Sequence, residues 1–133
     1  MKRSLTALVF ALLGFLGIGL SAGVAGADPL TPAFAEICNG TSGCVTANIS
    51  FSNRSATVVG NVFDDRNSGS TTAVFDFYTA NGYYSTQTRT AANERRSFNF
   101  TEPGPVGGIN LVRVWLVANA TGAYTFVADV HKP

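Results

Sequence analysis

The chain has 133 residues, a formal net charge of +1, two cysteines and one histidine. This length allows one domain with a processed segment, and the near-zero charge argues against a protein built to neutralise nucleic-acid phosphates. With 46% hydrophobic and 11% aromatic residues the chain can fill a core. A single histidine leaves little room for most histidine-dependent catalytic or metal sites.

Residues 1–27 have the pattern of a secretory signal peptide. The chain begins with two basic residues, continues with an apolar run over 5–20, and places Ala25 and Ala27 where a signal peptidase needs small residues. The apolar run is about 16 residues long, which is shorter than the roughly 20 that span a bilayer. We therefore predict cleavage between Ala27 and Asp28, a secreted protein, and no membrane span after cleavage.

Cleavage would change the composition that matters for folding. Residues 28–133 carry seven basic and eight acidic residues, so their formal charge is −1. They are poor in Leu and rich in Val, Thr, Asn and aromatic residues. This composition favours strands over helices.

The leader also resembles those of known exported proteins. It is rich in Gly and Ala and ends in Ala25-Gly26-Ala27-Asp28-Pro29. In this it resembles the leaders of small exported proteins of actinobacteria, including mycobacteria. The resemblance covers the leader and the first mature residues, and it implies export but no particular activity.

Residues 28–44 are predicted to form an N-terminal arm. Two prolines keep its start extended, and one short helical turn is expected over 33–37. Cys38 and Cys44 follow, separated by a run of Asn, Gly, Thr and Ser that can turn tightly. In an exported protein two cysteines most simply pair, so we predict a disulfide that clamps the arm locally. A redox or metal-binding role for the two cysteines is the alternative.

From residue 45 onward, apolar and polar residues alternate with the period of two that is typical of strands. The alternation and the turn signals between runs predict strands over 45–52, 56–62, 73–77, 83–90, 98–100, 109–118 and 124–130. We therefore expect residues 45–133 to form an all-β domain, an antiparallel immunoglobulin-like β-sandwich of about seven strands. A small β-barrel is the alternative.

The alternation also predicts which side chains fill the core. In the last strand it places Tyr124, Phe126, Ala128 and Val130 on one face. The large core residues expected from all strands are Phe51, Val62, Phe75, Phe77, Phe98, Phe100, Val112, Val114, Leu116 and Phe126. Each would stabilise the fold by about 1.5–3 kcal/mol through burial, before entropy is counted.

Two surface patterns are candidates for binding. Leu111, Arg113, Trp115 and Val117 alternate with the core residues of their strand and could form an exposed apolar stripe for a partner, unless a neighbouring strand or the arm covers them. The second pattern combines basic and aromatic residues that could bind a polyanion or a glycan. Its members are Tyr83, Tyr84, Arg89, Arg95 and Arg96. The alternative is that they guard a solvated strand edge.

A polar loop offers a weak candidate for calcium. Its oxygen-bearing residues at alternate positions are followed by a glycine, but a later carboxylate is missing, and Ca²⁺ takes six to eight oxygens. The candidate ligands are Asp64, Asp65, Asn67 and Ser70. The alternative is an ordinary polar hairpin loop.

These observations favour a small secreted protein that works by binding and not by catalysis, with no cofactor. We expect an extracellular or cell-surface interaction module whose partner is a protein or a glycan and not a nucleic acid. The alternative is a secreted inhibitor or toxin-like protein that presents the loop at 102–108 to a target. A third hypothesis is a hydrolase that uses two carboxylates among Asp64, Asp65 and Asp76.

The cleavage site gives the first testable prediction. When the full chain is produced in a host that exports it, the secreted form should begin at Asp28, because Ala25 and Ala27 fit the small-residue positions of signal peptidase. Intact-mass and N-terminal peptide mass spectrometry of the culture medium measure this. An Ala27→Leu variant should be retained uncleaved, and recovery of a mature chain with residues 1–27 still attached would contradict the prediction.

Overall fold

The computed structural model of the chain describes residues 33–40, 42–65 and 69–133. The secondary structure of these residues consists of strands without helices. The strands are β2 (Ala33–Cys38), β3 (Gly43–Phe51), β4 (Ala56–Asp64), β5 (Thr71–Thr79), β6 (Gly82–Ala91), β7 (Arg95–Glu102), β8 (Leu111–Ala118) and β9 (Ala123–His131).

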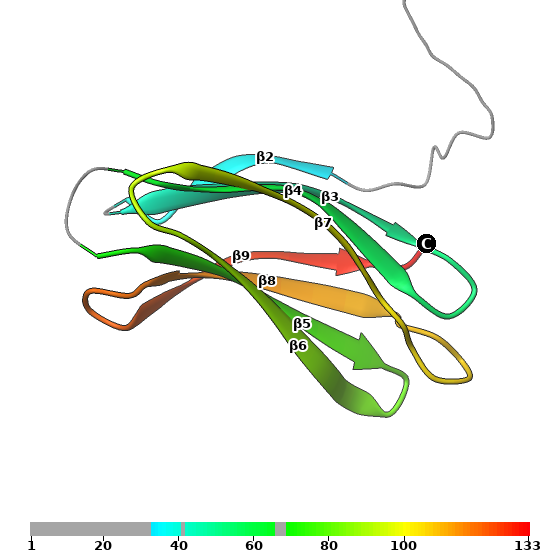
Figure 1. Cartoon of the computed structure of the whole chain (residues 1–133). Helices are drawn as coiled ribbons and strands as arrows, with labels where there is room; N and C mark the ends of the chain where they lie inside the picture. The colour runs from blue at the N-terminus through cyan, green and yellow to red at the C-terminus, as the bar shows by residue number, and fades with distance from the viewer. Residues whose placement is uncertain (1–32, 41, 66–68) are drawn as a thin grey trace, which may run out of the picture. The chain divides into compact units, whose positions relative to one another are not determined.

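The strands form two antiparallel sheets that pack face to face (Figure 1). One sheet has the order β2-β3-β4-β7 and the other has the order β6-β5-β8-β9. The chain crosses between the sheets from β4 to β5, from β6 to β7 and from β7 to β8. The prediction of an all-β antiparallel sandwich is confirmed. The alternative of a small barrel is wrong, because the two sheets do not close on each other.

The predicted arm contributes a strand that the sequence analysis did not anticipate. Residues 33–38, for which a helical turn was expected in part, form β2 and pair antiparallel with β3. Phe34 and Ile37 from this strand pack against the core, which explains why pairing prevails over a helical turn. Cys38 therefore lies at the end of a strand, whereas the sequence analysis had placed it in an arm that precedes the strands. The remaining strands, β3 to β9, correspond to those that were predicted.

The core lies between the sheets and is built from the inner face of each strand. Buried or partly buried side chains among those predicted are Phe51, Val62, Phe75, Phe77, Phe98, Phe100, Val112, Val114 and Leu116. The ring of Phe75, from one sheet, packs edge-on against Phe98 and Phe100 from the other, with centroid distances of 5.3 and 5.5 Å. Such pairs add stabilisation beyond that of burial.

The prediction that Phe126 is a core residue is wrong. The partner of Val114 is Ala128 and the partner of Trp115 is Phe126, so Val127 is an extra residue in β9, a β-bulge. The bulge inverts the alternation over the first half of the strand. Val127 is buried, whereas Phe126 is 51% exposed on the outer face.

A chain of side-chain hydrogen bonds ties loops together at one end of the sandwich. Asp64 at the end of β4 is 2% exposed, and its carboxylate accepts bonds from the hydroxyl of Thr71 (2.7 Å) and the main-chain N–H of Asn93 (2.6 Å). Because a hydroxyl has one proton, Ser42, whose oxygen lies 3.0 Å from that of Thr71, must be the donor to Thr71. The Asn39 amide donates in turn to Ser42. This network joins the disulfide loop, the start of β5 and the β6–β7 turn.

Truncation of Asp64 should therefore destabilise the domain strongly. An Asp64→Ala variant removes the acceptor of the buried Thr71 hydroxyl and of the part-buried N–H of Asn93, and an unsatisfied buried donor costs about 1–3 kcal/mol. We expect the free energy of unfolding, measured by urea denaturation, to fall by about 2 kcal/mol or more. Glu94→Ala removes an exposed carboxylate from the neighbouring turn and should change it by less than about 0.5 kcal/mol. Equal effects of the two substitutions would contradict this role for Asp64.

Candidate binding face

The outer face of the β6-β5-β8-β9 sheet carries an exposed group of aromatic side chains, which we call the aromatic cluster. It consists of Trp115 on β8 with Tyr124 and Phe126 on β9. The ring centroid of Trp115 lies 6.1 Å from that of Tyr124 and 5.7 Å from that of Phe126. Tyr124 is 63% exposed and Phe126 is 51% exposed. The bulge at Val127 creates the cluster, since it turns both β9 rings toward the side on which Trp115 stands.

The predicted stripe of β8 lies on this same face. Val112, Val114 and Leu116 point into the core, so Leu111, Arg113, Trp115 and Val117 face outward between β5 and β9. Val117 is nevertheless buried, and the other three are half-buried. The four stripe residues therefore lie on one face, as predicted, but the most exposed side chains beside Trp115 are Tyr124 and Phe126 of the neighbouring strand β9.

An ion pair borders the aromatic cluster, two residues before Trp115 on β8. Arg113 forms two hydrogen bonds with the carboxylate of Asp129, from Nε at 2.7 Å and from Nη2 at 2.9 Å. Its guanidinium also lies 5.4 Å from the ring centre of Tyr78. The bonds from Arg113 lower the pKa of Asp129 below its usual value of 3.8, and they raise the pKa of Arg113. The charges of Arg113 and Asp129 therefore compensate each other beside the cluster.

The predicted basic and aromatic set is not brought together. Tyr83 and Tyr84 are exposed on β6, where Tyr83 packs edge-on against Tyr78. Arg89 lies 4.2 Å from the ring centre of Phe100. Arg96 reaches the same strand at the main-chain oxygen of Thr90, but Arg95 lies on the outer face of the other sheet, so the five residues do not form one patch.

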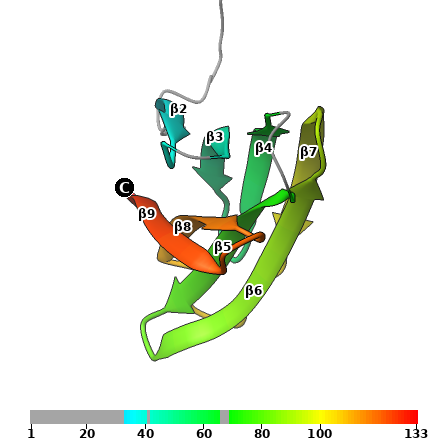
Figure 2. The same ribbon diagram turned by 90° about the vertical axis from the view of Figure 1, so that its left-hand side faces the viewer.

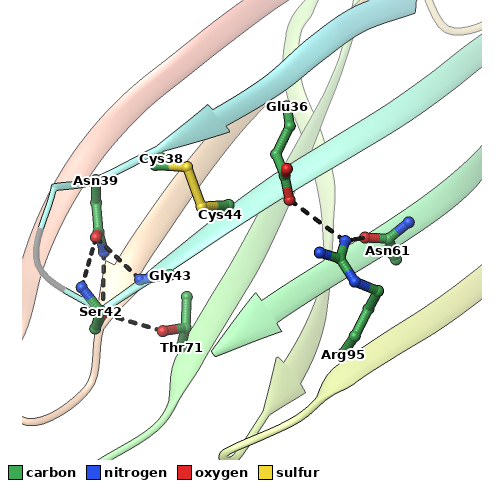
Figure 3. Close-up of a disulfide and its surroundings, with 9 residues drawn as sticks. All are labelled: Glu36, Cys38, Asn39, Ser42, Gly43, Cys44, Asn61, Thr71 and Arg95. Carbon is green, nitrogen blue, oxygen red and sulfur yellow. Dashed lines mark hydrogen bonds and ion pairs between the residues drawn. A yellow bond between two sulfur atoms is a disulfide. The ribbon is translucent and has the colours of Figure 1, made fainter. Parts of the chain in front are cut away.

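Arg95 and Arg96 follow one another on β7 but point in different directions. Arg95 forms an ion pair with Glu36 at 3.3 Å and a hydrogen bond with Asn61, on the outer face of the other sheet (Figure 3). Arg96 donates to the main-chain oxygen of Thr90 at 3.0 Å. Both residues are thus engaged with side chains or main chain of the protein itself.

The predicted disulfide between Cys38 and Cys44 is present and joins the end of β2 to β3 (Figure 3). The two cysteines are register partners across the strand pair. Inside the loop, the side-chain oxygen of Asn39 accepts bonds from the main-chain N–H groups of Ser42 and Gly43. A shallow hollow of about 120 Å³ lies beside the disulfide and is also lined by Phe63 and Asp65.

The candidate calcium ligands that the structure describes point to different places. Asp64 is turned inward and engaged in the network described above, whereas Ser70 accepts a bond from the amide of Asn119 at 2.8 Å. The main-chain N–H of Asp65 donates to Ser42. Asn67 lies outside the described residues. Within the described ranges, no group of three or more His, Cys, Asp or Glu side chains is placed to hold a metal ion.

The three carboxylates considered for hydrolysis do not converge on one cleft. Asp64 is buried at the end of β4, and Asp65 follows it beside the disulfide hollow. Asp76 lies on the outer face of the other sheet, where it accepts a hydrogen bond from Thr86 at 2.7 Å. His131, the single histidine, is exposed at the end of β9.

The sequence analysis missed Tyr124 and Phe126 as surface residues. Strict alternation placed them inside, and neither Gly nor Pro marks the bulge that turns them out. The one available signal is the run Phe126-Val127-Ala128, in which three consecutive apolar residues break the period of two.

The Arg113–Asp129 pair predicts a specific pH dependence. Because the folded pKa of Asp129 is lowered, the pair stabilises the fold above pH 3.8, and this contribution is lost as the pH falls through the folded pKa. NMR titration of the side-chain carboxyl should give a midpoint below 3.8 in the wild type and a higher one in Arg113→Met. Arg96→Met, on the other sheet, should leave the midpoint unchanged. A wild-type midpoint at or above that of Arg113→Met would contradict the assignment.

Comparison with known proteins adds no relative from which function could be transferred. No family model matches the chain, and neither the curated proteins nor the solved structures contain a significant match. In the part of the chain that the structure describes, no helix has the length and apolar character needed to cross a membrane. Functional arguments therefore rest on the residues of the candidate face.

Proposed function

We propose that the protein is an exported interaction module that binds a partner protein through the outer face of its β6-β5-β8-β9 sheet. The observation that carries this proposal is the bulge at Val127, which exposes Tyr124 and Phe126 beside Trp115. A regular β9 without the bulge would point these two large rings inward. The rings instead form a contiguous apolar surface, which is the kind of surface that partners cover.

The contrast between the two outer faces supports this choice of surface. The outer face of the β2-β3-β4-β7 sheet is lined by short polar side chains, among them Thr46, Asn48, Thr57 and Thr101. Thr57 and Thr101 hydrogen-bond to each other across β4 and β7. Among the described residues of this face, the large exposed aliphatic residue is Val59, at 41%. The exposed cluster of aromatic rings in the described structure lies on the other sheet, at Trp115, Tyr124 and Phe126.

The geometry of the rings favours a protein partner over a glycan. Tyr124 and Phe126 stand at 75° and 81° to the plane of Trp115. Rings that are nearly perpendicular do not form one flat platform on which sugar rings could stack. They form an uneven apolar surface, and aromatic residues of this kind are enriched where proteins contact proteins.

Export agrees with the chemistry of the domain. A small domain that closes a disulfide between its only two cysteines is typical of oxidising compartments. The pattern of residues 1–27 points the same way. A binding role in place of catalysis is supported by the scattered positions of Asp64, Asp65 and Asp76 and by the exposed strand-end position of His131.

A second candidate function is supported by the loop between β7 and β8. Val106 at its tip is 86% exposed, while Ile109 at its base is fully buried and its N–H donates to the main-chain oxygen of Arg54. The N–H of Gly108 closes a turn by donating to Pro105. A protruding residue on a loop braced at its base is how an inhibitor presents itself to a target enzyme, so an inhibitory role is the alternative.

Capture of partner proteins, followed by affinity measurements on the purified pair, tests the proposal. Proteins captured from the envelope and medium of the producing organism by the exported wild type are identified, and each affinity is then measured by calorimetry. Tyr124→Ser/Phe126→Ser should weaken the true interaction about 30-fold or more, because even one buried aromatic residue at an interface centre contributes about 2 kcal/mol or more. Val59→Ser, an exposed apolar residue on the other face, is the matched control.

The outcomes separate the candidate functions. Unchanged affinity in Tyr124→Ser/Phe126→Ser would contradict the proposed face. Loss of affinity in Val106→Ser alone would favour the inhibitor alternative. Binding to a purified glycan, abolished by the same aromatic substitutions, would keep the face but overturn the choice of a protein partner.

A further inference from the structure

Four of the described strands lie at the edge of a sheet, and they are not protected equally. β2 and β7 end one sheet, and β6 and β9 end the other. An edge strand presents main-chain N–H and C=O groups that can pair with another strand, and proteins usually block them with side chains, charges or bulges. The described strands differ in which of these devices they use.

The edge strands β6 and β7 lie on the same side of the sandwich (Figure 2), and side-chain hydrogen bonds join them. Ser85 and Gln87 on β6 both donate to the carboxylate of Glu102 on β7, at 2.7 and 2.8 Å. Glu102 is 8% exposed. These bonds join the edge strand of one sheet to the edge strand of the other, so each covers part of its neighbour.

Two arginines then cap main-chain oxygens of β6 directly. Arg89 donates to the oxygen of Thr88 at 2.7 Å, and Arg96 donates to the oxygen of Thr90 at 3.0 Å. Thr88 and Thr90 are two residues apart, which is the spacing of groups that point to the same side of a strand. The β6 edge is thus guarded by charged side chains, as the sequence analysis had offered as an alternative for these arginines.

β9 has no comparable guard. From Tyr124 to His131, among the residues that the structure describes, no side chain hydrogen-bonds to the main chain of the strand. In the part of the chain that the structure describes, the edge protection of β9 consists of the bulge at Val127 and the charge of Asp129. The part of β9 up to and including the bulge residue, 123–127, has the sequence Ala-Tyr-Thr-Phe-Val and contains no charged residue, proline or glycine. An uncharged edge of this composition is prone to pair with another strand.

We propose that β9 pairs antiparallel with β9 of a second copy of this chain, with Thr125 at the two-fold axis. In this register Tyr124 lies opposite Phe126 of the second copy, and both are outer-face residues. Ala123 lies opposite Val127, and both belong to the inner face. The segment is therefore self-complementary, as an interface with two-fold symmetry requires.

Charge supports a second copy as the occupant. Self-pairing of a strand places like charges close together, which destabilises the pair. Residues 123–127 avoid this problem because they are uncharged, and Asp129, the nearest charge, is neutralised by Arg113 of its own chain. Pairing would join the two sheets into one and bring the two aromatic clusters side by side. The inference does not depend on the proposed partner protein, since it concerns the protein alone.

The oligomeric state of the exported chain tests this proposal. Light scattering and sedimentation, with no other protein present, should give a mass that rises with concentration to twice that of the monomer. Phe126→Lys, which places a charge in the paired segment, should keep the chain monomeric. Tyr84→Lys adds the same charge at the other edge of the sheet and should leave the dimer intact. A wild type that stays monomeric at all concentrations would overturn the proposal, whatever the outcome for a partner protein.

A cysteine at the axis tests the register without relying on Phe126→Lys. Under mild oxidation, Thr125→Cys should form a covalent dimer, because residue 125 faces its own counterpart at about 4.5–5.5 Å between Cβ atoms. Ala123→Cys, which faces Val127 of the second copy in this register, should not. Efficient cross-linking of Ala123→Cys with none of Thr125→Cys, or a dimer that forms equally well with Phe126→Lys, would contradict pairing through β9.

Discussion

The packing of Phe75 against Phe98 and Phe100 is the interaction on which the rest of the structure depends. The three rings come from different sheets, and they meet where β5 faces β7 across the core. Because the described part of the chain has no helix to cover a sheet, each sheet can bury its inner face only against the other. The core therefore takes one side chain in two from the strands and leaves the alternate ones for the two outer faces.

This alternation of core-facing and outward-facing side chains explains how much of the fold could be predicted. A period of two identifies strands whose one face is buried, so β3 to β9 could be predicted from the alternation of residues such as Val45, Ala47 and Ile49. β2 could not, because two prolines precede it and Ala-rich residues with Glu36 suit a helical turn locally. Only its pairing with β3, a contact distant from any local propensity, makes it a strand.

The candidate site, too, could be predicted only where its strands are regular. The β8 stripe around Trp115 lies within one regular strand, so its common face followed from the period alone. Tyr124 and Phe126 lie beyond a bulge, and a shift of one residue moves every following side chain to the opposite face. Arg89, Arg95 and Arg96 were grouped because they are close in sequence. Which strands flank β6 and β7 decides where these arginines point, and strand order is not encoded in a local pattern.

The disulfide helps to hold β2 over the edge of β3. Among the described strands β2 pairs with β3 alone, and the Cys38–Cys44 bond fastens it at the end where the chain turns. Without that bond, β2 would be held by its ladder with β3 and by the packing of Phe34 and Ile37. Its departure would uncover the nine-residue edge of β3. In a reduced chain only non-covalent contacts would keep β2 on this edge, and loss of β2 would leave an edge strand that can pair with another chain. Formation of the Cys38–Cys44 bond fastens β2 over that edge, so oxidation of two cysteines near one end of the domain also protects the neighbouring sheet edge from pairing with another chain.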